Sequence, residues 1–428
     1  AGKYAGWFEH NSGRKATDQH SGKAFAQSLD EANWATKVAM AYMAIKPVLS
    51  KEEVKAIEEG YLQPAATLLL HRPAGANWQM WHNSGLAALG IALENDSIVD
   101  VAINKDKYGY HYLIGKHKNS DGWINEGSPH YHYYPLEALL FTANAVKCRG
   151  IKLFDKDLHD MFVEPVKGTY PDLSFPAHSD GWYGANLLSQ SALYEVGNAR
   201  YNDPFLKRVL ELTYAQKKRL DPEALLSNQL IKASEESLLQ KSYSFDTSGF
   251  CLLRSDTRTV VLKFGGEGIG HGHPDKLSIT IHDGKNELVS DFGTSGYGVP
   301  DYLKWYKRTL SHNTVTVDAK DQKRSVGKLL KFNPRSDGGY AEAETTTAYP
   351  GVRMKRSLDL KGTHLQDVYT CTSDSSHLYE YVILFNEKPL MDGQPTATTL
   401  TGSEVHERIH NIFSYPHKSG FTCRTSSA

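Results

Sequence analysis

The stretch from Gly270 to Asp318 contains the residues with the clearest chemical potential. His271 and His273 are separated by one residue, and Asp291 and His312 follow within the same run of strand-like sequence. Residues i and i+2 of a strand point to the same face, so the two histidines could converge on one site. Imidazole and carboxylate ligands suit a metal such as zinc. Two histidines at this spacing are more often hydrogen-bonded or surface residues, but the addition of Asp291 and His312 favours a metal, for which three ligands suffice.

A second segment, GANWQMWHNSGLAALG at 75–90, joins aromatic and polar side chains at the start of an apolar helical pattern. Trp78 and His82 are four residues apart and would share one face of a helix. The segment is either an amphipathic helix start with aromatic core residues or the floor of a cleft. The polar Asn77 and His82 beside Trp78 and Trp81 favour the cleft.

A third segment, DGWINEGSPHYHYYPLEAL at 121–139, places a tyrosine and histidine cluster before another helix. It either caps a helical hairpin or faces a substrate. Its polar and aromatic members are Trp123, Glu126, His130, Tyr131 and Tyr134. A weaker candidate is FPAHSDGWYG at 175–184, a loop with His178, Asp180 and Trp182, since loops often carry binding residues.

The elements that must position these residues change in character near residues 235–245. Apolar residues recur at helical spacing over 31–49, 51–70, 81–93, 135–148, 187–197 and 203–216. After residue 243 polar and apolar residues alternate, and Asp283–Gly284 is a hairpin turn signal. The sequence therefore predicts a helical domain over residues 1–240, built of antiparallel hairpins as a bundle or a toroid. An antiparallel β-sandwich is predicted over residues 241–428.

The bulk composition excludes several classes of protein. The 428 residues include 48 basic and 49 acidic side chains, with no basic block that would suggest nucleic acid. Four scattered cysteines form neither a disulfide framework nor a thiolate zinc site. No apolar run reaches membrane-spanning length, and the first residues lack a signal region, so an exported protein would be present here in its mature form. The final SGFTCRTSSA lacks a clear closing strand, as expected of a truncated sandwich.

The order of the motifs resembles the heparinase II/III-like polysaccharide lyases and the alginate lyases of the same architecture. The motifs are NW at 77–78, GL at 85–86, EGSPHYHYY at 126–134, GHGHPD at 270–275, SDFG at 290–293 and YKRTLSHNTVTVD at 306–318. The tail DVYTCTSDSSHLYEYVILF at 367–385 is also similar. The resemblance covers roughly residues 30–390 and implies an incomplete (α/α) toroid followed by an antiparallel β-sandwich, with a uronate-binding groove where they meet.

The activity implied by the resemblance is β-elimination at a uronic acid, which leaves a C4–C5 double bond. A base takes the C5 proton after the carboxylate is neutralised, and an acid protonates the leaving C4 oxygen. Candidate substrates are alginate and glycosaminoglycans such as heparan sulfate, hyaluronan or chondroitin. The neutral overall charge does not indicate a heavily sulfated glycan.

The resemblance also implies roles for individual residues. Tyr131 matches the catalytic tyrosine, Asn77 the residue that faces the carboxylate, and His271 the β-domain histidine at the reaction centre. Trp78 stands where several relatives have a histidine, which leaves the base open, and His82 could bring an imidazole to the same face. A second β-domain tyrosine would be Tyr297 or Tyr302. His273, Asp291 and His312 match the ligands of one structural zinc ion, and the expected substrate contacts are Trp78, Trp81, Glu126, Tyr134, His178, Tyr302 and Arg308.

Two other functions are compatible with the sequence. A glycoside hydrolase on a helical toroid needs two opposed carboxylates, which Glu126 and Asp180 could supply. A non-catalytic glycan-binding protein would have kept the groove alone. The expected partner is an acidic polysaccharide or oligosaccharide, with no nucleic acid and no membrane, and a homodimer is possible. The expected location is periplasmic or secreted.

Overall fold

The chain divides into two compact units, each described here by itself. The computed structural model describes residues 21–227, 231, 238, 241–266, 270–387, 390–391, 396–397, 406, 413–414 and 423–424. The helical unit comprises 1–124, 131–163 and 190–236, and the β-unit comprises 125–130, 164–189 and 237–428. The main change thus lies close to the predicted boundary at 240/241. Two short segments from the first half of the chain nevertheless belong to the β-unit.

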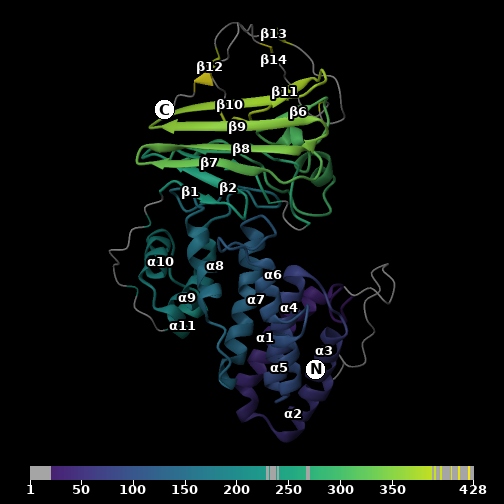
Figure 1. The fold of residues 1–428 in the computed structure, drawn as a ribbon. Helices are drawn as coiled ribbons and strands as arrows, with labels where there is room; N and C mark the ends of the chain where they lie inside the picture. Colours follow the sequence, from purple (N-terminus) through teal and green to yellow (C-terminus); the bar gives the residue numbers. More distant parts are fainter. Residues whose placement is uncertain are drawn as a thin grey trace. The chain divides into compact units, whose positions relative to one another are not determined.

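The helical unit is built from consecutive helices joined by short turns (Figure 1). Their bounds are α1 (Ser28–Ile45), α2 (Lys51–Ile57), α3 (Gln63–Leu70), α4 (Ala76–Ala92), α5 (Asp96–Asn104), α6 (Tyr110–His117), α7 (His130–Val146), α8 (Lys156–Val166), α9 (Ser191–Tyr201), α10 (Pro204–Gln216) and α11 (Pro222–Ser227). Short 3₁₀ or π turns are η2 (Lys46–Val48), η3 (Glu58–Leu62), η4 (Lys147–Arg149) and η5 (Leu187–Gln190). The predicted helical segments all coincide with helices or their flanking turns.

Helix α4 lies at the centre of the packing within this unit. It contacts α1, α3, α5 and α6, and residues on all of its faces are buried. The hydroxyls of Thr36 on α1 and Ser84 on α4 share a hydrogen bond of 2.7 Å. The next helix begins at a side-chain cap, because Asn95 Oδ1 accepts from the backbone N–H groups of Ser97 and Ile98.

The β-unit contains two larger antiparallel sheets (Figure 1). The first has the order β1-β2-β3-β4-β5, formed by β1 (Tyr243–Phe245), β2 (Phe250–Arg254), β3 (Thr259–Lys263), β4 (Ser278–His282) and β5 (Glu287–Val289). The second has the order β10-β9-β8-β7, formed by β7 (Lys328–Arg335), β8 (Gly338–Tyr349), β9 (Val352–Lys361) and β10 (His364–Thr372). Strand β6 (Val315–Val317) pairs with β11 (Tyr379–Tyr381). Two further pairs consist of two-residue strands. One joins β12 (Leu390–Met391) to β15 (Cys423–Arg424), and the other joins β13 (Thr396–Ala397) to β14 (Phe413–Ser414). Between β5 and β6 lie the turns η6 (Tyr302–Tyr306) and η7 (Thr309–Ser311).

The core of the β-unit lies between these sheets. Residues along β9 alternate between buried and more exposed positions, as the period of two predicts. Its buried residues Met354, Leu358 and Leu360 join Leu253 and Val260 of the first sheet in one apolar cluster. The fold-class prediction, a helical region followed by an antiparallel sandwich, is confirmed.

The predicted Asp283–Gly284 turn joins β4 to β5. Asp283 Oδ1 accepts from the N–H groups of Lys285 and Asn286 at 2.9 and 2.8 Å, and Gly284 has a φ of +93°. Both features are typical of a tight hairpin. Among the described residues, no helix combines the length and the apolar character needed to cross a membrane.

Candidate active site and metal cluster

Asp180 lies in a loop of the β-unit that backbone hydrogen bonds hold on both sides. Its own N–H donates to the carbonyl of His271 at 3.1 Å, and the carbonyl of Gly181 accepts from the N–H of Thr294 at 3.0 Å. Gly293 has a φ of +59°, and a Cβ at this position would lie 1.9 Å from the Gly181 carbonyl oxygen. Glycine is therefore required for the two loops to approach so closely.

The carboxylate of Asp180 is surrounded by hydrogen-bond donors. Its Oδ2 lies 2.9 Å from His271 Nδ1 and accepts from the hydroxyls of Tyr297 and Tyr302, each at 2.9 Å. Its Oδ1 lies 2.9 Å from His273 Nε2. Burial alone would raise the pKa of Asp180, but the hydrogen bonds from the two histidines outweigh it and hold the pKa well below its ordinary value. Asp180 is thus an ionised acceptor, and we call these five residues the Asp180 cluster.

His271 has one ring nitrogen inside this cluster and the other turned toward a second carboxylate. Nδ1 lies 2.9 Å from Asp180 Oδ2 and 2.8 Å from the Tyr297 hydroxyl. Donation from Nδ1–H to Asp180 leaves the lone pair on Nε2. Nε2 lies 3.9 Å from Oε2 of Glu126, which is 1% exposed. An imidazolium formed at His271 would therefore lie between two carboxylates that stabilise its charge.

Aromatic and cationic side chains lie near the Asp180 cluster. Tyr297 is 56% exposed and Trp182 is 44% exposed. The ring of Trp182 lies 6.4 Å from that of His130, and Lys307 Nζ lies 3.9 Å from Asp180 Oδ2. Aromatic faces suit the apolar faces of sugar rings, and an ammonium group suits their acidic substituents.

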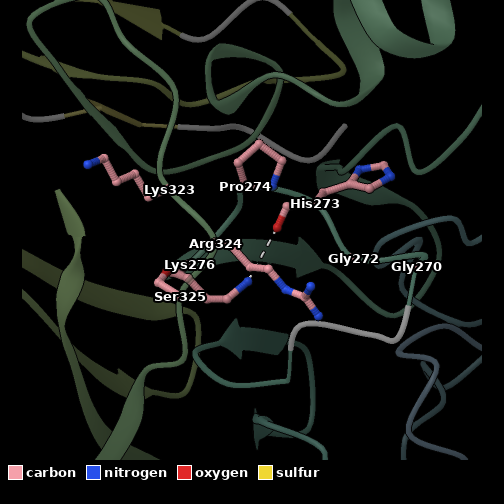
Figure 2. A pocket seen from close by; sticks show the side chains of 8 residues that line it. All are labelled: Gly270, Gly272, His273, Pro274, Lys276, Lys323, Arg324 and Ser325. Atoms are coloured by element: carbon pink, nitrogen blue, oxygen red, sulfur yellow. Dashed lines mark hydrogen bonds between the residues drawn. The ribbon is translucent and has the colours of Figure 1, made fainter.

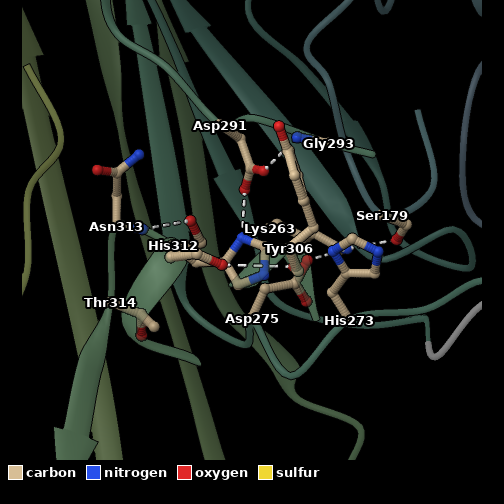
Figure 3. Close-up of polar contacts among 12 residues, drawn as sticks. Ser179, Lys263, His273, Asp275, Asp291, Gly293, Tyr306, His312, Asn313 and Thr314 are labelled. Carbon is tan, nitrogen blue, oxygen red and sulfur yellow. Dashed lines mark hydrogen bonds and ion pairs between the residues drawn. The ribbon is translucent and has the colours of Figure 1, made fainter. Parts of the chain in front are cut away.

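Two buried carboxylates and an imidazole form a candidate metal cluster inside the β-unit (Figure 3). Asp275, Asp291 and His312 each offer a ligand atom, and these atoms lie within 4.8 Å of one another. His312 Nδ1 lies 2.8 Å from Asp291 Oδ2, and Gly293 N–H donates to Asp291 Oδ1 at 3.0 Å. The structure therefore brings together two of the three predicted zinc ligands and adds Asp275. We call Asp275, Asp291 and His312 the inner cluster.

The third predicted ligand, His273, lies beside the inner cluster. Its ring centroid is 5.3 Å from that of His312, and its Nε2 is engaged by Asp180. Within the described part of the chain, His273 Nδ1 and His312 Nε2 are buried without a hydrogen-bond partner. Most buried nitrogens in folded proteins have a hydrogen-bond partner, and a bound cation would supply a partner to these two. They fit a bound cation, and ligation by His273 stays a prediction.

Two lysines partly neutralise the inner cluster without a metal. Lys263 Nζ contacts Asp275 Oδ2 and donates to Ser179 Oγ at 2.7 Å, and Lys276 Nζ lies 3.2 Å from Asp275 Oδ1. Burial would raise the pKa of Asp275, but the two ammonium groups hold it well below its ordinary value. A bound cation would therefore be coordinated mainly by Asp291, by Nε2 of His312 and by Nδ1 of His273.

The predicted residues of the helical unit lie on two helices. Helix α4 carries Asn77, Trp78, Trp81 and His82, and α7 carries Tyr131 and Tyr134. Trp78 is partly exposed, whereas Trp81 is fully buried, with its ring 5.2 Å from that of Tyr134 and 6.0 Å from that of Phe141. The structure corrects the expectation for Trp81, because a side chain enclosed by core aromatics has no face left for a sugar.

Tyr131 lies in the first turn of α7 and is half-buried. The next residue anchors this turn: His132 Nδ1 accepts from Ile124 N–H at 3.2 Å, and its Nε2 lies 2.8 Å from the carbonyl of Met161. Burial lowers the pKa of His132 to about 4, so the ring is neutral and Nε2–H donates. The catalytic roles of Tyr131, Asn77 and His82 stay predictions.

Two further predicted substrate contacts have internal partners in the β-unit. The ring of His178 is 7% exposed and lies 5.3 Å from that of Phe250, and burial lowers its pKa to about 4. Arg308 Nε donates to Asp321 Oδ2 at 2.6 Å. These internal contacts give His178 and Arg308 a role in the packing of the β-unit. Contact of either residue with substrate stays a prediction.

Asp180 and Asp275 gain a central place in the structure that their motifs alone do not predict. Asp180 was visible as part of a polar loop between aromatic residues, and Asp275 closes the GHGHPD motif. Asp180 and His271 are 91 positions apart in the chain, so no local periodicity joins them.

Two family models match the chain. Residues 238–397 match the model described as heparinase II/III-like, C-terminal, and residues 17–163 match the model described as alginate lyase. The chain is therefore similar to the alginate lyase model in its first part and to the heparinase II/III-like C-terminal model in its second part. The resemblance drawn from the motifs is confirmed. The region that matches the heparinase II/III-like model contains His271, Tyr297 and the inner cluster.

Curated relatives are similar over most of the chain. An alginate lyase of Stenotrophomonas maltophilia is 28% identical over 421 residues, which cover 86% of this chain and 56% of that enzyme. An exo-oligoalginate lyase of Saccharophagus degradans is 26% identical over 428 residues, with the same two coverages. The chain thus spans little more than half the length of these relatives.

Solved structures share the fold. The crystal structure of heparinase III has a TM-score of 0.68 at 16% identity, covering 88% of this chain and 60% of that one. Heparan sulfate lyase HepC from Pedobacter heparinus has a TM-score of 0.66 at 16% identity, covering 86% of this chain and 57% of that one. At this identity the likeness concerns the fold.

Proposed function

We propose that the protein is a polysaccharide lyase that cleaves a uronic-acid polysaccharide by β-elimination. The observation that carries the proposal is the Asp180 cluster, in which an ionised carboxylate orients an imidazole beside two phenols. The matches to alginate lyase and heparinase II/III-like models support it. Because the relatives that match over 86% of the chain are named alginate lyase and exo-oligoalginate lyase, alginate is the first substrate to test.

His271 is the proposed proton acceptor of the β-unit. With Nδ1–H donated to Asp180, its Nε2 can take the C5 proton of a uronate, and the imidazolium then lies between Asp180 and Glu126. Lys307, 3.9 Å from Asp180, can offset the uronate carboxylate, which must be neutralised before the C5 proton becomes acidic. Tyr131 is the proposed acid for the leaving oxygen.

The contacts of Asp180 weigh against the glycoside hydrolase alternative. A hydrolase would need one of the carboxyls Glu126 and Asp180 as a protonated acid and the other as a free carboxylate. Both oxygens of Asp180 are occupied by donors, and its pKa is held low. Asp180 therefore fits neither role as well as it fits the orientation of His271.

Replacing Tyr131 by Phe tests the proposed function in the helical unit. Removal of one hydroxyl leaves the ring in place, so folding is expected to persist while kcat falls by about 10²–10⁴-fold, the usual contribution of a general acid or base. The assay is the rise in ultraviolet absorbance from C4–C5 unsaturation on a panel of alginate and glycosaminoglycans. The control is Tyr112→Phe on the exposed side of α6. Full activity in Tyr131→Phe would reject the assignment.

We also propose that the inner cluster holds one structural zinc ion. Asp291, His312 and the orphaned Nδ1 of His273 would be its ligands, with Asp275 as a fourth donor. When bound, the ion would fix the loops that carry these residues and would supply no step of the reaction.

Zinc is therefore expected to raise the stability of the metal-free protein. At a free concentration about 100 times the dissociation constant, the gain is about 2.7 kcal/mol. Thermal unfolding with and without zinc measures it, with magnesium as the control ion. Asp291→Asn should remove most of the gain. An unchanged unfolding temperature in the wild type would contradict the zinc assignment.

A further inference from the structure

The β-unit contains a basic pocket that the proposed chemistry does not use (Figure 2). Its volume is about 280 Å³, which suits the acidic end of one sugar rather than a length of polymer. The pocket is lined by Gly270, Gly272, His273, Pro274, Lys276, Lys323, Arg324 and Ser325. Among these described lining residues three side chains are cationic and none is acidic, and although Lys276 also pairs with Asp275, Lys323 and Arg324 add positive charge that favours an anion.

A buried hydroxyl in the pocket has no partner. Ser325 is 5% exposed, and within the described residues its Oγ makes no hydrogen bond. Leaving a buried hydroxyl unpaired costs about 1–3 kcal/mol. An oxyanion between Ser325 and the neighbouring cations would accept this hydrogen bond.

The backbone that carries Lys276 and Lys323 is held in place by the fold. Gln322 brackets the backbone of Lys276, since its Oε1 accepts from Lys276 N–H at 2.7 Å and its Nε2 donates to the Lys276 carbonyl at 3.0 Å. The N–H of Lys323 donates to the carbonyl of Ala348 at 2.8 Å. Lys276 is buried, whereas Lys323 and Arg324 are exposed at the opening. A pocket with its backbone already ordered binds at a lower entropic cost.

The same loop borders the pocket and carries His271. Gly270 and Gly272 line the pocket, while the imidazole between them bonds to Asp180. Figure 2 shows the imidazole of His273 turned away from Lys276 and Arg324, so the backbone of this residue forms the pocket wall. An acidic polysaccharide bound at His271 would carry further carboxylates or sulfates along this loop.

We propose that the basic pocket binds a carboxylate or sulfate of the polysaccharide, on a sugar other than the one that is cleaved. This rests on the proposed function for the identity of the ligand, while the oxyanion chemistry follows from the pocket itself. Ser325 contacts the anion inside, next to the Lys276–Asp275 pair, and Lys323 and Arg324 hold it at the opening.

Binding of sodium sulfate and of sodium glucuronate, titrated calorimetrically at constant ionic strength, tests the proposal. We expect saturable one-site binding of at least one of the two anions. The double variant Lys323→Gln/Arg324→Gln, at two exposed positions, should bind about tenfold or more weakly. Ser325→Ala should weaken binding by a smaller factor. The control Lys285→Gln/Lys361→Gln removes the same charge from exposed sites elsewhere in the β-unit and should bind as the wild type does.

Tighter binding of sulfate would assign the pocket to a sulfated glycan, and tighter binding of glucuronate to a polysaccharide with carboxylates alone. No saturable binding of either anion, or equal binding by the two double variants, would overturn the proposal. The absorbance assay on the same wild-type protein separates this result from the proposed function. Unsaturated product without anion binding would reject the anion site and retain the proposed lyase activity. Anion binding without product on any substrate would retain the anion site and reject the lyase activity.

Discussion

Asp180→Asn is expected to lower kcat by about 10²–10⁴-fold, the range lost when a general base is removed or misoriented. An asparagine has one acceptor oxygen where the carboxylate has two, and its NH₂ group would face donors instead of accepting from them. His271, Tyr297 and Tyr302 all depend on Oδ2 of Asp180. Initial rates of unsaturated-product formation at saturating substrate give the change in kcat.

The matched control is Asp172→Asn in the same segment of the β-unit. Asp172 also pairs with a histidine, since its Oδ2 lies 3.6 Å from His282 Nε2. Its side chain, however, is 43% exposed, and it is not a member of the Asp180 cluster. Its loss should leave kcat within about twofold and cost less than about 1 kcal/mol of stability. Circular dichroism at the assay temperature separates misfolding from lost chemistry. Wild-type kcat in Asp180→Asn would remove Asp180 from the proposed mechanism.

Arg356→Met is expected to destabilise the β-unit by about 3–5 kcal/mol, the cost of breaking a buried ion pair on one side. Arg356 is fully buried, and its guanidinium donates to both oxygens of Asp367, to the carbonyls of Leu277 and Asn313, and to the Tyr381 hydroxyl. Methionine retains the apolar stem but leaves the carbonyls of Leu277 and Asn313 without this donor, and leaves Asp367 with the Tyr381 hydroxyl in place of the guanidinium. The shift of the urea midpoint, followed by circular dichroism, measures the loss.

Arg353→Met on the same strand is the control for this change. Arg353 is 58% exposed and pairs with Glu344 at 2.5 Å, a surface ion pair whose loss should cost less than about 1 kcal/mol. Equal midpoints for the two variants would show that Arg356 does not hold the sandwich together.

The architecture could be predicted from the sequence because hydrophobic periodicity reports local structure. The helical segments, the change near residue 240 and the Asp283–Gly284 hairpin all depend on neighbours in the chain. Asp291 and His312 were predicted as partners because short motifs contain them. The homodimer, the export and the individual substrate contacts stay predictions.

The rest of the site depends on contacts between distant segments. Asp180 gains its importance from donors at positions 271, 273, 297 and 302, which only the folded chain brings to it. Trp81 shows the opposite case, since its polar neighbours suggested a cleft while Tyr134 and Phe141 enclose it. Lys276 follows Asp275 directly in the sequence, but Lys263 lies 12 positions before Asp275 and reaches it only in the folded chain.

The interleaving of the two units affects how the protein can be divided and how it is made. A fragment that begins near residue 240 would lack Asp180 and Glu126, although it would retain His271, Tyr297 and the inner cluster. During synthesis the segment 164–189 leaves the ribosome long before the strands it must join, because Asp180 precedes His271 by 91 residues. That segment therefore waits for its partners while the intervening chain is translated, and the Asp180 cluster cannot form until residue 302 has been synthesised.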